Sequence, residues 1–181
     1  MRKIIEETLV SLDGVIEDPA KWVGDYFDDE FVQATFERLL TRDAMLMGRR
    51  TYEILVKDWS ARTGEYADVI NGIPKHVFSS TLERTDWHNS TIVRGDVVAE
   101  VALLKQQDGR DLVIWGHGLL GQTLLAHHLL DEIRVSIFPV VVGHGKLLFR
   151  ENESTTLKLI ATTSLPTGVV ALRYEPELHP T

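Results

Sequence analysis

The sequence contains no cysteine. A disulfide framework and a thiolate metal site are therefore both excluded. It also has no apolar run approaching the roughly eighteen residues of a membrane span, and Glu6 and Glu7 interrupt the N-terminal stretch where a signal peptide needs an unbroken apolar region. These absences favour a soluble protein of the reducing cytoplasm.

The sequence also has fewer basic residues than acidic ones. The chain has 19 Lys and Arg against 27 Asp and Glu, a formal net charge of −8, and no basic run. This balance repels nucleic acid and anionic membranes, so neither is expected as a partner. The histidines lack the spacing of metal ligands, since His127 and His128 are adjacent and diverge on a helix, and no metal is expected.

The 181 residues show no internal repeat, low-complexity stretch or linker. A chain of this length buries a substantial core as one domain. We expect a single domain over residues 1–176, followed by a tail at 177–181 that frays.

Short apolar runs alternate with segments of helical period. The runs are too short for helices and predict strands at 44–47, 76–78, 91–93, 111–115 and 133–142. Apolar residues recur every three or four positions over 27–40 and again over 97–104. Because parallel neighbours need long crossovers, this alternation predicts a three-layer α/β fold with a mostly parallel sheet. Two later runs, "TTLKLIATTSL" and "GVVALRYEP", predict an antiparallel C-terminal hairpin.

Three of the expected strands end in polar corners. In "MLMGRRTYEIL" the strand stops at Gly48, and a helix is expected to begin near Thr51. The first-turn amides and the helix dipole would then face the strand end, where Arg49 and Arg50 add permanent charge. This arrangement suits phosphate groups. The alternative is a solvated arginine pair with Thr51 as an ordinary N-cap.

The other two corners follow later strands. In "KHVFSSTLE" a strand runs into three hydroxyl groups that would cap a helix or bind an oxyanion, those of Ser79, Ser80 and Thr81. In "DLVIWGHGLLGQTLL" a buried strand ends, before an amphipathic helix, in Gly116, His117 and Gly118. Ligands bind beyond the carboxyl ends of strands in open parallel sheets, so the three corners are expected to hold one extended phosphorylated cofactor.

These motifs resemble the dihydrofolate reductase superfamily, specifically stand-alone proteins similar to the reductase domain of the bacterial riboflavin biosynthesis protein RibD. The segments "SLDGVI", "MGRRTYE", "VFSST", "LVIWGHG" and "LLDEIRVSIFPVVVGHGKLLF" occur in that family's order over nearly the whole chain. No G-x-G-x-x-G follows the first strand, which excludes the ordinary Rossmann fingerprint. The resemblance implies a dihydrofolate reductase-like fold and NADPH as the cofactor.

The resemblance also implies roles at the cofactor end. Arg49 matches the residue that meets the adenosine 2′-phosphate, with Ser79 and Ser80 as its hydroxyl partners. Arg50 and Thr51 match positions against the pyrophosphate. Further cofactor contacts are implied for Gly48, Thr81, Gly116, His117, Gly118 and Leu119.

At the third corner, dihydrofolate reductases carry a cis peptide bond between two glycines. The resemblance therefore implies a cis bond between Gly116 and His117, despite a cost of roughly 2.5–4 kcal/mol. The alternative is a trans corner with the imidazole turned outward, which would favour a protein without catalysis.

The sequence gives fewer indications of the residues that contact the substrate and supply the proton. Hydride donation to a C=N or C=O bond needs a proton source, and Asp13 in "SLDGVI" matches an acid that lies by the nicotinamide in the riboflavin reductases. Asp-Gly is equally an ordinary turn pair, so both interpretations stay open. Trp22, Phe27 and Phe31 are candidates for an apolar substrate slot, although aromatic residues at helical spacing are more often core.

Dihydrofolate reductases themselves place a carboxylate on the helix before the "MGR" strand. The corresponding position here falls close to Val32, which puts folate in doubt as a substrate. Glu6 and Glu7 alternate across the first strand, so one of them can point inward, as a functional group or as a paired charge.

We interpret the chain as an NADPH-dependent reductase of a small heterocyclic or carbonyl compound. The alternative is a nucleotide-binding module that has kept the cofactor corners without catalysis. A stand-alone riboflavin-pathway reductase is a third interpretation, but a fused zinc deaminase is excluded by the missing cysteines. The resemblance also implies a homodimer.

Overall fold

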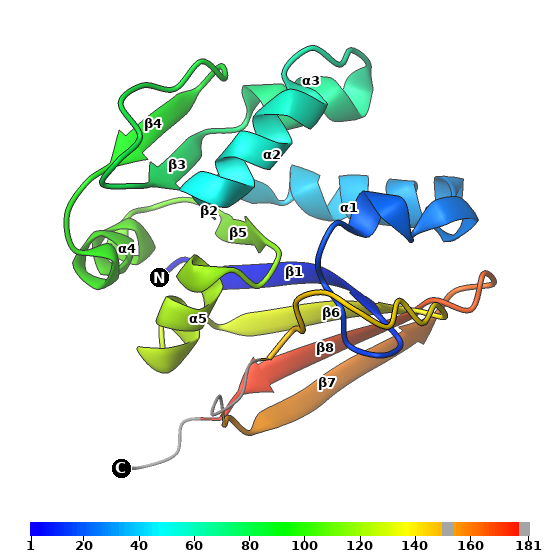
Figure 1. Cartoon of the computed structure of the whole chain (residues 1–181). Coiled ribbons are helices and arrows are strands. Elements are labelled where there is room, and N and C mark those ends of the chain that lie inside the picture. Colours follow the sequence, from blue (N-terminus) through cyan, green and yellow to red (C-terminus); the bar gives the residue numbers. More distant parts are fainter. Residues whose placement is uncertain (150–153, 178–181) are drawn as a thin grey trace.

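The computed structural model describes residues 1–149 and 154–177. In this part of the chain one sheet contains eight strands: β1 (Ile4–Ser11), β2 (Arg42–Gly48), β3 (Lys75–Phe78), β4 (Ser90–Val93), β5 (Asp111–Trp115), β6 (Glu132–Phe138), β7 (Leu157–Ser164) and β8 (Val170–Pro176). Their order across the sheet is β4-β3-β2-β5-β1-β6-β8-β7. The first six strands pair in parallel, and β8 runs antiparallel to both β6 and β7 (Figure 1). The predicted mostly parallel sheet with an antiparallel C-terminal hairpin is confirmed.

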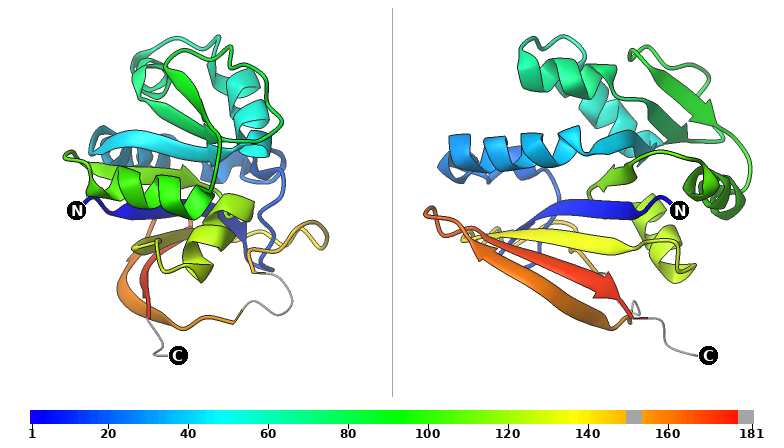
Figure 2. Two further views of the ribbon diagram at one scale, coloured as in Figure 1. Left: turned by 90° about the vertical axis from the view of Figure 1, so that its left-hand side faces the viewer. Right: turned by 180° about the vertical axis from the view of Figure 1, so that it is seen from behind.

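Helices cover both faces of the sheet, which makes three layers (Figure 2). One face carries α1 (Asp29–Leu40), α2 (Arg49–Trp59) and α3 (Glu65–Gly72), and the other carries α4 (Val97–Gln106) and α5 (Leu119–Ala126). Two short 3-10 helices, Pro19–Lys21 and Gly24–Tyr26, precede α1. None of the helices in the described ranges is long and apolar enough to cross a membrane.

The central strands are buried on both faces, which explains why they appear in the sequence as continuous apolar runs. Along β2, Leu46 packs toward α4 and α5, while Met45 and Met47 pack toward α1, α2 and α3. Each fully buried side chain of this size contributes roughly 1.5–3 kcal/mol. The two cores fix β2 and β5 side by side, so their carboxyl ends open at one edge of the sheet.

Two element boundaries differ from the predictions. The strand predicted over 133–142 ends at Phe138, where Pro139 removes an amide donor and the chain turns back toward the end of β1. The segment after Ser79 continues through a loop to β4 rather than into a helix. Of the tail predicted at 177–181, residues 178–181 lie outside the described residues.

Candidate functional site

A cleft of about 1290 Å³ opens at the carboxyl ends of β2, β3 and β5 and continues between α1 and α2. Its volume exceeds the roughly 300–1,000 Å³ of a typical small-molecule site, so a dinucleotide and a small substrate can fit together. Most of the residues predicted for the site line this cleft, namely Phe27, Phe31, Gly48, Arg49, Arg50, Thr51, Ser79, Ser80, Gly116, His117, Gly118 and Leu119.

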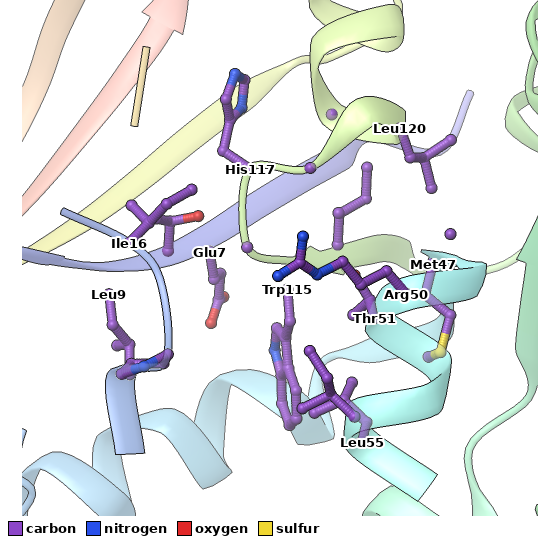
Figure 3. A pocket seen from close by; sticks show the side chains of 18 of the residues that line it. Glu7, Leu9, Ile16, Met47, Arg50, Thr51, Leu55, Trp115, His117 and Leu120 are labelled. Atoms are coloured by element: carbon purple, nitrogen blue, oxygen red, sulfur yellow. The ribbon is translucent and has the colours of Figure 1, made fainter. Parts of the chain in front are cut away.

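The first corner lies where β2 passes into α2. The helix begins at Arg49 rather than near Thr51, because Gly48 occupies the N-cap position with an extended backbone. Gly48 has no side chain with which to cap the helix, so the first-turn amide groups stay available to a ligand. Arg50 reaches from α2 into the cleft in Figure 3, and its Nη2 lies 3.2 Å from Glu17 Oε1. The corner therefore combines two guanidinium groups with a helix N-terminus.

The second corner meets the first through Arg49. Its Nη1 donates to Thr81 Oγ1 at 2.8 Å, and its Nε donates to Glu53 Oε1 at 2.6 Å. Ser79 Oγ accepts from the backbone amides of Thr81 and Leu82 at 3.2 and 3.0 Å. Of the two roles expected for these hydroxyl groups, the structure shows no helix cap, since Ser79 stabilises a turn. Thr81 does not line the cleft, but it positions the guanidinium group that does.

The third corner turns at Gly116, whose φ of +78° lies in the region that favours glycine. The Gly116–His117 bond is trans, as is every peptide bond in the described ranges, so the expected cis bond is wrong. The imidazole is not turned outward either, because His117 Nδ1 lies 2.8 Å from Glu6 Oε1 and both side chains are fully buried. In Figure 3 the ring points away from Arg50 and Trp115 and leaves the cleft open.

Two helices start at this end of the cleft without a side-chain cap. The N-cap residues are Gly48 for α2 and Gly118 for α5, whereas the Asp96 side chain caps α4 by accepting from Ala99 N. A Cβ built on Gly48 or Gly118 would meet no atom within 4 Å. Ligand atoms can therefore approach both helix ends closely, and the aligned amide groups there favour an anion.

The other half of the cleft has apolar walls that include Leu9, Phe27, Phe31, Trp59 and Trp115. The rings of Phe27 and Phe31 pack with centroids 5.0 Å apart. Trp22 lies outside the lining, because its indole N–H donates to Glu17 O and its ring packs edge-on against Phe138. The structure thus brings two of the three predicted aromatic residues into the slot and assigns Trp22 to the core.

Asp13 also lies outside the cleft lining. Its carboxylate accepts from Ser11 Oγ at 2.6 Å and from the amides of Val142 and Gly143 at 3.1 and 2.7 Å. The Ser11 hydroxyl and these amides lower the pKa of Asp13 to about 2. A carboxyl group with that pKa holds no proton at neutral pH, so the geometry fits the turn interpretation rather than a proton donor.

The two glutamates of β1 point to opposite faces of the sheet. Glu6 faces α5 and His117, while Glu7 lies in the cleft next to Trp115, its neighbour in the β1–β5 register (Figure 3). The Glu7 side chain is only 13% exposed. The sequence indicated that one of the pair would point inward, and the structure shows that both are buried from solvent but only Glu7 enters the cleft.

Three arginines from distant segments surround Glu7. The nearest nitrogen–oxygen distances are 3.4 Å for Arg38 of α1, 3.5 Å for Arg42 of β2 and 3.7 Å for Arg134 of β6. Burial lowers the pKa of Arg42 despite the nearby Glu7 charge. Sequence analysis missed this cluster, because no motif joins three arginines that come from α1, β2 and β6.

The fold and the cleft together define a three-layer α/β protein with a ligand-sized cleft at the carboxyl ends of its central strands. The family model described as the RibD C-terminal domain matches residues 2–171, and the chain belongs to this family. The chain is 31% identical over 179 residues to the uncharacterized protein YyaP of Bacillus subtilis (strain 168), covering 96% of this chain and 94% of YyaP. It is 30% identical over 168 residues to the uncharacterized protein YwjB of the same organism, covering 89% of this chain and 91% of YwjB.

Solved structures share the fold at low sequence identity. A protein of Shewanella sp. PV-4, provisionally assigned to riboflavin biosynthesis, superposes with a TM-score of 0.75 at 23% identity over 97% of this chain and 99% of that one. A pyrimidine reductase-like protein of Corynebacterium diphtheriae gives 0.70 at 12% identity over 98% and 93%. The deaminase/5-amino-6-(5-phosphoribosylamino)uracil reductase of Thermotoga maritima gives 0.69 at 14% identity, with 97% of this chain but 56% of that protein covered.

Proposed function

We propose that the protein is an NADPH-dependent reductase of a small heterocyclic or carbonyl compound. The observation that carries the proposal is one cleft with two different halves. At one end, two helix N-termini without side-chain caps and two arginines converge at the strand ends. At the other end, the apolar side chains of Leu9, Phe31 and Trp115 line the cleft in which Glu7 and its arginines lie. A phosphorylated dinucleotide suits the first half, and a planar substrate suits the second.

Each of the three corners would contact a different part of the cofactor. Arg49, whose guanidinium group donates to Thr81, would hold the 2′-phosphate together with Ser79 and Ser80. The amide groups at the starts of α2 and α5 receive the pyrophosphate, with Arg50 as a charged partner. The open backbone at Gly116 and Gly118 would let the nicotinamide ribose approach, and Trp115 would be available to contact the nicotinamide.

Bound NADPH supplies the hydride, and the protein supplies position and a dry environment. The apolar side chains of Leu9, Phe31 and Trp115 line the inner cleft and would exclude water from a bound substrate. Because Asp13 is ionised and lies outside the lining, an ordered water at the cleft mouth remains as the proton source.

A non-catalytic NADP-binding module is the second candidate. One observation favours it, since the residues of α1 that line the cleft, Phe31, Thr35 and Arg38, include no carboxylate.

Both candidates predict saturable NADPH binding, which can be followed by quenching of tryptophan fluorescence, because Trp59 and Trp115 line the cleft. Oxidation of NADPH with any member of a panel of pterins, aminopyrimidines and quinoid carbonyls establishes the reductase. Binding without oxidation across the panel favours the module, and no binding at all contradicts both.

We also propose a homodimer. The apolar segment 133–142 contains β6, which lies between β1 and β8 and is therefore an interior strand without a free edge. The edge strand β7 instead exposes Leu159 and Ile160, at 51% and 42%. Sedimentation at micromolar concentration should give a dimer mass; a monomer mass would contradict the proposal.

A further inference from the structure

Glu7 differs from the other carboxylates of the cleft. Among the described residues, the acidic side chains in the lining are Glu7, Glu17, Asp18, Glu53 and Asp58. Three of these pair with a cation outside the inner cleft, since Glu17 contacts Arg50, Asp18 contacts Lys21 and Glu53 contacts Arg49. Asp58 is exposed at the end of α2. Among these five carboxylates, only Glu7 lies on a strand of the sheet, β1, in the apolar half of the cleft.

Two of the three arginines around Glu7 have other carboxylate partners. Arg134 pairs closely with Glu132, and Arg42 Nη1 lies 3.8 Å from Asp111 Oδ2. The three contacts with Glu7 come from Arg38 Nε at 3.4 Å, Arg42 Nη2 at 3.5 Å and Arg134 Nη1 at 3.7 Å. All three are longer than the 2.7–2.9 Å or so of a strong charge-assisted hydrogen bond. An ionised carboxylate accepts about four hydrogen bonds. Glu7 is thus held in place by charge and retains capacity to accept from a closer donor.

Arg38 and Arg134 line the cleft beside Glu7 but stay 3.4 and 3.7 Å from it. An N–H donor on a ligand at ordinary hydrogen-bonding distance would therefore be the nearest donor to the Glu7 carboxylate. A planar ligand between Trp115 and Phe31 would place its edge against Glu7, next to Trp115 in the β1–β5 register. Two parallel N–H groups match the two oxygens of a carboxylate.

We propose that Glu7 is a specificity-determining residue, which selects planar substrates that present an amidine or an amino-substituted ring N–H edge. This inference rests on the proposed reductase function, because the substrate edge is set by a ring lying beside the nicotinamide position. Arg38 and Arg134 act as positioning residues for the Glu7 carboxylate. A substrate with a carbonyl or carboxylate at the same edge would place a second acceptor against the Glu7 carboxylate, with no hydrogen to share between them. We expect the site to reject such a substrate.

Three probes of nearly the same shape test this inference. Benzamidine offers two N–H donors and a positive charge, benzamide is neutral, and benzoate is an anion. Their dissociation constants are measured by titration calorimetry against the whole protein, with and without saturating NADP⁺. We expect benzamidine to bind most tightly and benzoate most weakly. In Glu7→Gln, benzamidine should lose roughly ten- to a hundred-fold in affinity, as expected for a lost hydrogen bond to a charged group.

Two further variants keep the test decisive. Glu7→Asp keeps the charge on a shorter side chain, so it should keep the order of the probes with a smaller spread, even if Glu7→Gln does not fold. Glu37→Gln is the matched control, because Glu37 is an exposed carboxylate of α1 that bonds Gln33 and does not line the cleft. It should bind all three probes as the wild type does.

The inference is overturned by a wild-type preference for benzoate, which would show that the arginines face the ligand. It is equally overturned by an unchanged order in Glu7→Gln, or by no benzamidine binding at millimolar concentration. NADP⁺ affinity is recorded in the same experiments. A protein that selects benzamidine through Glu7 but binds no NADP⁺ contradicts the proposed reductase and supports the Glu7 inference, so the two failures are distinguishable.

Discussion

Arg49→Ala should weaken NADPH binding while leaving NADH binding nearly unchanged. Arg49 already makes two short hydrogen bonds, to Glu53 and Thr81, which fix its guanidinium group at the junction of the first two corners. A hydrogen bond to a charged group contributes roughly 1.5–3 kcal/mol, equal to about ten- to a hundred-fold in the dissociation constant. Because the Arg49 side chain is 48% exposed, we expect the lower end of this range and a smaller effect at high salt.

The assay is a fluorescence titration of each variant with NADPH and NADH at low and high ionic strength. Arg84→Ala is the control, since Arg84 is an exposed cation paired with Asp86 outside the cleft, and it should change neither affinity. Glu53→Gln should tighten NADPH binding by a few-fold, because it removes a negative charge and a competing acceptor from Arg49. Equal losses of NADPH and NADH affinity in Arg49→Ala would refute the assignment of Arg49 to the 2′-phosphate.

Three further outcomes follow from the packing and the charges. Gly121→Ala should lower the free energy of unfolding in urea by roughly 1–3 kcal/mol, because its Cβ would overlap the buried Glu6 carboxylate; an unchanged midpoint would contradict the close approach. Burial lowers the pKa of Lys75 from 10.5 to about 8, so Lys75 loses its proton at a lower pH in the folded state than in the unfolded state. The free energy of unfolding of the wild type relative to Lys75→Met should therefore rise between pH 8 and 10.5. The pKa of Asp13 is lowered from 3.8 to about 2, so its stabilising effect relative to Asp13→Asn should be present above pH 4 and be lost toward pH 2; a pH-independent difference would contradict it.

The sheet could be predicted because each of its strands has a local sequence pattern. The runs 44–47 and 111–115 are apolar on both faces, as parallel strands between helix layers must be, and they prove to be neighbours in β2 and β5. The helix α2 was predicted to begin near Thr51 but begins two residues earlier, at Arg49, because Gly48 takes the N-cap position. A glycine at a strand end fits both a turn and a cap, and local sequence does not separate the two.

The side-chain partners at the site could not be predicted, because they come from distant segments. Asp13 binds the amide of Gly143, and the imidazole of His117 lies against Glu6, 130 and 111 residues away along the chain. Both contacts depend on which strands become neighbours. The sequence therefore identified the corners that face the cleft, but not the buried charges beneath and beside them.

The most direct test of the account is a crystal structure of the protein with NADP⁺. We predict the 2′-phosphate between Arg49 and the Ser79–Thr81 turn, and the pyrophosphate at the N-termini of α2 and α5. The nicotinamide should lie beside Trp115, with one face open toward Glu7. A cofactor bound outside this cleft, or one bound with its 2′-phosphate away from Arg49, would contradict the account.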